Sequence, residues 1–226
     1  MRQRHAYGWY GKVPCLGDFV RTGLSSEFVK AWDDWMQTTL TIAQEALGGH
    51  WRQAYFTAPI WRFAMSAGIM GPGAVAGIMM PSVDRVGRQY PLCLAVEVEA
   101  SAWCAYRAIQ PAFGGMEEAA LSMLEDGSSL SLLEEKLMRL PVPRHLPHTQ
   151  RTRLGSATAI LTDDSPEIAF STLALEEMAS IWIAPIAGTN RILVSPNLPL
   201  GPEQAIALFT DSPQWEYQER TEGVLR

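Results

Sequence analysis

An amphipathic stretch near the N-terminus sets the strongest limit on how this chain can fold. Between Ser25 and Gly49, apolar side chains recur every three or four residues, and polar side chains fill most of the other positions. Ser25 or Ser26 can cap the start, and Gly48-Gly49 can end the pattern. The pattern predicts a helix of about 20 residues, about 30 Å long, which is enough to cover one face of a sheet. The expected core positions are Phe28, Trp32, Trp35, Met36, Leu40, Ala43 and Leu47.

Short apolar or alternating segments, bounded by turn residues, supply the candidate strands. In chain order they are Tyr7–Val13, Ile60–Ser66, Val75–Met80, Cys93–Val98, Ala157–Thr162, Ser180–Ala184 and Arg191–Ser195. The short turn GIMGPGA between the second and third candidates predicts a hairpin. We expect Pro14–Gly23, which follows the first candidate, to be a loop.

Further helices are expected between and after these strands. The candidates are Ala102–Leu124, Leu132–Leu140, Pro166–Met178 and Pro202–Thr210. The first has an interruption at Pro111 and Gly114-Gly115. The second begins with a capping-box signature formed by Ser131 and Glu134. Strands interleaved with helices indicate a layered α/β domain.

We interpret residues 1–226 as a single domain. The proline-rich stretch PVPRHLPHTQRTR, residues 141–153, could mark a domain boundary. The segment after it, however, looks too short to bury an independent core. We therefore expect residues 141–153 to form a long surface loop.

Composition excludes several classes of protein. Acidic residues outnumber basic ones by 24 to 18, and the resulting net charge of −6 argues against a nucleic-acid partner and, more weakly, against an anionic membrane surface. The three cysteines, Cys15, Cys93 and Cys104, are odd in number and widely spaced, which does not suit a disulfide framework. No apolar run has the length of a signal peptide or a membrane-spanning helix. We expect a cytoplasmic protein with reduced thiols and no membrane insertion.

The sequence contains no familiar catalytic or metal-binding motif. It lacks a P-loop, an HExxH pair, a Cys-x-x-Cys pair and a Gly-x-Ser-x-Gly elbow. His145 and His148 flank Pro147, where no helix would set the geometry of a metal pair, so we interpret them as solvated. Asp33 and Asp34 would point apart on a helix and make a poor acid–base pair. We therefore predict no catalytic residue, metal, cofactor or small-molecule substrate, and expect a protein that binds another protein.

Two segments nevertheless combine turn residues with charges. In GKVPCLGDFVRTGL, Gly17 and Asp18 are typical of a turn, and Lys12 comes just before them at the end of the first strand. An enzyme of unrecognised type could bring Asp18, Lys12 and Asp84 into one cleft, because all three are close to the ends of predicted strands.

The second segment, PSVDRVGRQYPL, places Asp84, Arg85 and Arg88 between two apolar strands, with Gly87 available for a positive φ. It can be a solvated loop whose arginines pair with Asp84. It can also be a rigid charged platform for a partner, since a guanidinium binds a carboxylate in bidentate fashion. The candidate interaction residues are Lys12, Gly17, Asp18, Asp84, Arg85, Gly87 and Arg88.

Both segments resemble the TagF family, which accompanies bacterial type VI secretion systems. The run GWYGKVPCLGDFVRTGLSSEFVKAWDDWMQ has the family's aromatic-Gly-Lys-x-Pro strand, its Gly-Asp-Phe loop, and its helix with Phe, Trp-Asp and Trp. PSVDRVGRQYPL matches a second signature, Ser-Val-Asp-Arg-x-Gly-Arg followed by an aromatic residue and Pro-Leu. SIWIAPIAG and ILVSPNLP near the C-terminus are a weaker third match.

The resemblance implies a fold, a function and a partner. The fold is a three-layer α/β/α sandwich around a mixed, largely antiparallel sheet, similar in outline to longin-like domains. The function is that of a cytoplasmic, non-enzymatic negative regulator, which restrains type VI secretion after translation by binding the system's forkhead-associated scaffold protein. Two alternatives stay open: a structural component of the secretion machine, and the enzyme of unrecognised type described above.

Overall fold

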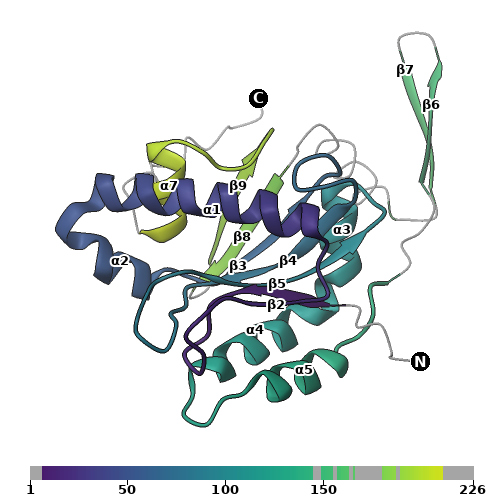
Figure 1. The fold of residues 1–226 in the computed structure, drawn as a ribbon. Helices are drawn as coiled ribbons and strands as arrows, with labels where there is room; N and C mark the ends of the chain where they lie inside the picture. Colours follow the sequence, from purple (N-terminus) through teal and green to yellow (C-terminus); the bar gives the residue numbers. More distant parts are fainter. Residues whose placement is uncertain are drawn as a thin grey trace.

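A seven-stranded sheet with the strand order β2-β1-β5-β4-β3-β8-β9 forms the middle layer of the computed structural model (Figure 1). The structure describes residues 7–144, 149–154, 157–162, 165, 180–186 and 189–210. The strands of this sheet are β1 (Gly8–Gly11), β2 (Val20–Thr22), β3 (Trp61–Met65), β4 (Ala74–Met80), β5 (Leu92–Val98), β8 (Ser180–Ile186) and β9 (Thr189–Ser195). Each pair of neighbours runs antiparallel, so the sheet is antiparallel throughout its described strands.

Three helices cover one face of the sheet: α1 (Ser26–Leu47), α2 (Trp51–Thr57) and α7 (Pro202–Phe209). The predicted capping of α1 is confirmed, because the Ser25 hydroxyl accepts a hydrogen bond from the Phe28 N–H at 3.1 Å and Gly48 has a positive φ of 50°. Six of the seven expected core residues of α1 are buried as predicted, and Leu47, in its last turn, is only partly buried. The centroid of the Trp32 ring lies 5.1 Å from that of Phe63 on β3. Helix α2 was not expected, since its seven residues are too few to show a helical period.

Three more helices, α3 (Ala102–Ile109), α4 (Phe113–Leu121) and α5 (Leu130–Met138), cover the opposite face (Figure 1). The expected break at Pro111 is confirmed by a 3₁₀ turn between α3 and α4. Gly114 and Gly115 lie inside α4 instead of interrupting it. A Cβ at Gly115 would lie 2.4 Å from a methyl group of Leu140, so this glycine lets the end of the α5 segment approach α4. With helices on both faces, the three-layer prediction is confirmed.

The start of α5 and the first strand-to-helix connection differ from the prediction. Ser129, not Ser131, caps α5, because its extended backbone lets the hydroxyl accept from the Leu132 N–H at 3.2 Å. The predicted loop Pro14–Gly23 contains the edge strand β2, whose three residues are too short for a period-two pattern.

The predicted proline-rich loop, residues 141–153, is a loop only in part. Residues 141–144 are irregular, whereas Thr149–Leu154 forms strand β6 and pairs with β7 (Ala157–Thr162) in a separate hairpin that projects from the body (Figure 1). The prolines end at Pro147, so nothing prevents strand pairing after it. His145, His148, the helix expected over Pro166–Met178 and the chain from residue 211 onward lie outside the described residues.

Candidate interaction surface

A buried ion-pair network joins the two loops that the sequence singles out. The Asp84 carboxylate is almost fully buried, and its Oδ2 lies 3.1 Å from the Lys12 ammonium and 2.6 Å from the Arg88 Nε. Its Oδ1 accepts hydrogen bonds from the backbone N–H groups of Val86 and Arg88, at 3.1 and 2.9 Å. Four donors therefore surround Asp84, which matches the capacity of an ionised carboxylate.

The surroundings of Asp84 keep it ionised. Burial alone would raise its pKa, but the backbone N–H of Arg88, the Lys12 ammonium and the Arg88 guanidinium together hold that pKa below its usual range. An acid–base role would need a free lone pair and a pKa nearer neutrality. Asp84 instead fixes the shape of its loop.

The loop that follows Asp84 is a tight turn bound to the neighbouring loop. The Gly87 N–H donates to the Asp84 carbonyl at 2.8 Å, and Gly87 has a φ of +84°, as predicted. The Arg85 N–H donates to the Leu16 carbonyl at 2.8 Å, and the Arg88 guanidinium donates to the Gly17 carbonyl at 2.6 Å. Residues about seventy positions apart are thereby held together.

The two arginines have different surroundings. Arg88 pairs with Asp84, as the solvated-loop interpretation expected of both arginines, and also donates to the Gly17 carbonyl. The Arg85 guanidinium lies over Gly17, where an added Cβ would be 3.4 Å from its Nη2. Among the described residues, no carboxylate or carbonyl pairs with the Arg85 side chain, which is exposed. Only Arg85 is therefore available for bidentate binding as the platform interpretation requires.

Three apolar side chains on the same two loops as Arg85 are exposed. Leu16, Phe19 and Val86 are 38, 40 and 71% exposed. We call these three residues, with Gly17 and Arg85, the two-loop surface. Sequence reasoning did not single out its apolar members, although a large apolar residue beside Gly17-Asp18 or Gly87 is a signal that could have been used.

Phe19 is fixed in place although it is partly exposed. Its ring stacks on Tyr10 with centroids 5.5 Å apart and meets Tyr90 edge-on at 4.7 Å. The Lys12 ammonium lies 5.1 Å from the centroid of the same ring. The two-loop surface therefore rests on a layer of aromatic rings.

Helix α1 supports this aromatic layer through Asp33. The hydroxyls of Tyr10 and Tyr90 both donate to Asp33 Oδ1 at 2.9 Å, and the Gln37 amide donates to Oδ2 at 2.6 Å. Burial and then the Asp33 carboxylate raise the pKa of Tyr10, so its hydroxyl stays protonated and can donate. Asp34 pairs instead with Lys30, which confirms that the adjacent carboxylates point apart.

Two of the three residues of the hypothetical enzyme cleft are paired with each other, and the third has a different partner. Lys12 and Asp84 are paired, whereas Asp18 is exposed and, among the residues that the structure describes, accepts only from the neighbouring Phe19 N–H, at 2.8 Å. This contact confirms the turn chemistry expected of Gly17 and Asp18. Among the described residues, no ion pair links Asp18 to Lys12.

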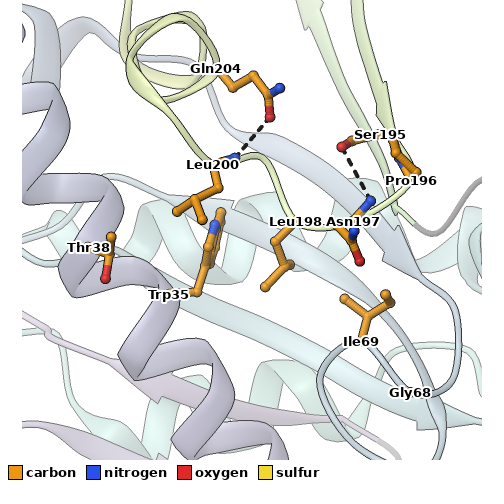
Figure 2. A pocket seen from close by; sticks show the side chains of 10 residues that line it. All are labelled: Trp35, Thr38, Gly68, Ile69, Ser195, Pro196, Asn197, Leu198, Leu200 and Gln204. Carbon is orange, nitrogen blue, oxygen red and sulfur yellow. Dashed lines mark hydrogen bonds between the residues drawn. The ribbon is translucent and has the colours of Figure 1, made fainter.

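A groove with a volume of about 650 Å³ lies on the α1 side of the sheet (Figure 2). It is enclosed by α1, the β3–β4 turn and the connection from β9 to α7. The Trp35 indole N–H donates to the Pro199 carbonyl at 2.8 Å, and Gln204 accepts from the Leu200 N–H at 2.9 Å. The lining residues are Trp35, Thr38, Gly68, Ile69, Ser195, Pro196, Asn197, Leu198, Leu200 and Gln204, none of which has a titratable side chain.

No group of three or more His, Cys, Asp or Glu side chains within the described ranges could hold a metal ion. In the same part of the chain, no helix combines the length and apolar character needed to cross a bilayer.

The architecture places the chain in the class of three-layer α/β/α proteins with an antiparallel central sheet. The family described as "TagF N-terminal domain, Type VI secretion system-associated" matches residues 8–140, and the chain belongs to this family. The crystal structure of PA0076 from Pseudomonas aeruginosa PAO1 is similar, with a TM-score of 0.75 and 29% identity over 91% of this chain and 94% of that one. No curated protein matches the chain.

Proposed function

We propose that this chain is a non-enzymatic regulator of bacterial type VI secretion, which restrains the system after translation by binding its forkhead-associated scaffold protein. The observation that carries the proposal is family membership. The matched residues 8–140 contain both loops of the two-loop surface and the network beneath them. An accessory role in type VI secretion follows from the family, and the restraint and the particular partner are the proposal.

The geometry of the two loops supports a binding role. Asp84 is saturated by donors, so its loop is a fixed support with an exposed arginine and exposed apolar side chains. Such a surface suits a protein partner because little order has to be gained on binding. We place the protein in the cytoplasm, where the scaffold would be accessible.

The two alternatives predict different results. An enzyme built on Asp18, Lys12 and Asp84 is disfavoured because Lys12 and Asp84 pair with each other, and no ion pair among the described residues joins Asp18 to them. A structural component of the machine is distinguished genetically. Deleting a structural component should abolish secretion, whereas deleting a restraint should raise it.

The direct test combines binding and secretion. The purified chain is titrated into the purified scaffold protein in a calorimeter, and a deletion strain is compared with its complemented parent for protein released into the medium. We expect saturable binding and raised secretion that complementation reverses. Absence of binding would overturn the proposal, and abolished secretion in the deletion strain would favour a structural role instead.

A further inference from the structure

We infer that the two-loop surface is the docking surface for a protein partner, and that it takes a partner segment in which a carboxylate lies beside an apolar side chain. The carboxylate pairs with the Arg85 guanidinium, and the apolar side chain packs against Leu16 and Val86. The inference deepens the proposed function and rests on it for the identity of the partner.

The turn that carries Arg85 and Val86 is anchored at its base, although its tip is exposed. Asp84 binds four donors below the turn, and Arg88 ties the turn to Gly17. The tip itself packs little, since Val86 is 71% exposed. An apolar residue in that position contributes almost no burial to the fold, so its chemistry suits contact with another molecule. Because the turn is already ordered, binding costs little conformational entropy.

Charge complementarity identifies the partner as acidic. The whole chain has a net charge of −6, but the exposed charge on the two loops is mainly cationic. Arg85 has no partner among the described residues, and the Arg88 side chain is 61% exposed even while it binds Asp84. Asp84 is buried, and the one exposed acid, Asp18, has an oxygen occupied by the Phe19 N–H. A guanidinium in this setting binds a carboxylate through parallel hydrogen bonds.

Two exposed apolar residues, Leu16 and Val86, adjoin the backbone of this arginine. The 2.8 Å hydrogen bond from the Arg85 N–H to the Leu16 carbonyl places Leu16 beside the turn, and Val86 follows Arg85 directly. Phe19 adds a half-exposed ring that its contacts with Tyr10 and Tyr90 hold still. An arginine and a fixed aromatic ring among apolar neighbours are the residue types that dominate binding energy at protein interfaces.

The test is titration of the full chain with the purified forkhead-associated scaffold protein. Arg85→Ala and Val86→Asp should each raise Kd by about 10- to 100-fold, while the melting temperature stays close to that of the wild type. Matched controls are Arg139→Ala, just after α5, and Val142→Asp, which changes a valine of the same 71% exposure. Wild-type affinity in the two surface variants, or equal losses in the controls, would overturn the inference.

Arg88 provides a further comparison because it is a positioning residue. Arg88→Ala should weaken binding and also lower the stability to urea, since it removes a contact to Asp84 and one to Gly17. Arg85→Ala should weaken binding alone. The salt dependence of the association rate should also become shallower in Arg85→Ala. If Arg85→Ala destabilises the chain as much as Arg88→Ala, Arg85 is structural and the inference fails.

A photo-crosslinking residue separates this inference from the proposed function. It replaces Val86, or Val142 as the control, in cells that carry the secretion system. If the scaffold does not bind in the calorimeter, the proposed function fails. The docking surface still stands if the Val86 position crosslinks to another component of the system, the Val142 position does not, and Arg85→Ala removes the adduct. No adduct at the Val86 position overturns the docking surface itself.

Discussion

Removing the Tyr90 hydroxyl should destabilise the protein at neutral pH. Tyr90 is 3% exposed, and its hydroxyl donates to Asp33 Oδ1 at 2.9 Å. A hydrogen bond to a charged group contributes about 1.5–3 kcal/mol, and Tyr90→Phe loses this bond while keeping the ring contacts. In a domain of this size, each 1 kcal/mol changes Tm by about 2–4 °C, so we expect a fall of about 3–12 °C.

The difference in unfolding free energy between the wild type and Tyr90→Phe should shrink as the pH rises above 10. Burial, followed by the nearby Tyr10 and Asp33, raises the pKa of Tyr90 far above its ordinary value of 10.0. The folded protein therefore keeps this proton at pH values where the unfolded chain loses it, and wild-type stability falls by about 1.4 kcal/mol per pH unit for this group. Phenylalanine has no such proton, so the deficit of about 1.5–3 kcal/mol should disappear about one to two units above pH 10.

Urea unfolding followed by tryptophan fluorescence measures both effects. Wild type and Tyr90→Phe are compared at about pH 8 and at about pH 11. A difference in unfolding free energy that is the same at both pH values would refute the reasoning, because Tyr90 would then ionise equally in both states. As a control, Tyr90→Phe is repeated in an Asp33→Asn background, where the lost hydrogen bond is uncharged and the deficit should be smaller.

Three further outcomes follow from the geometry. Gly77→Ala in β4 would place a Cβ 2.1 Å from a backbone oxygen of β5, and we expect it to lower the free energy of unfolding in urea by about 3 kcal/mol. The control Gly73→Ala, where the nearest atom to the added Cβ is 3.6 Å away, should cost less than about 1 kcal/mol. Equal losses in the two variants would contradict this prediction. Burial would raise the pKa of Asp84, but its donors hold that pKa below the ordinary 3.8, so the stability it provides is present above about pH 4 and is lost as the pH falls further. Asp84→Asn should therefore be less stable at neutral pH and flatter in acid, and an unchanged acid limb would refute it. Burial raises the pKa of the Cys93 thiol, so a maleimide should label Cys93 only after unfolding, while the two half-buried cysteines react in the folded protein; peptide mass mapping would reveal any early labelling of Cys93.

The elements that could be predicted from the sequence are those whose signal is long or local. Helix α1 has six turns of apolar period with a cap at Ser25 and a glycine at its end, so it was predicted almost to the residue. The strand β4 was recognised because all of its residues are apolar or glycine, as expected of a strand covered on both faces. Strand β2 could not be recognised, because its three residues form a strand only through pairing with β1.

The same distinction applies to the candidate site. The positive φ of Gly87 depends on its own turn and was predicted. Which arginine would bind Asp84 could not be predicted, because Arg88 is oriented partly by the Gly17 carbonyl in a distant loop. The role of Asp33 was missed for a similar reason, since Tyr10 and Tyr90 come from different parts of the chain and meet only in the folded protein.

Helix α1 connects the two-loop surface to the groove in Figure 2. Asp33 holds the two tyrosines beneath Phe19, and two residues later Trp35 forms a wall of the groove in Figure 2. Trp32, the residue before Asp33, is buried and packs against Phe63 on β3, which holds this part of the helix in the core. A molecule that displaced Trp35 would therefore also disturb Asp33, which supports Phe19 through the two tyrosines and lies two residues away, about 3 Å along the helix axis.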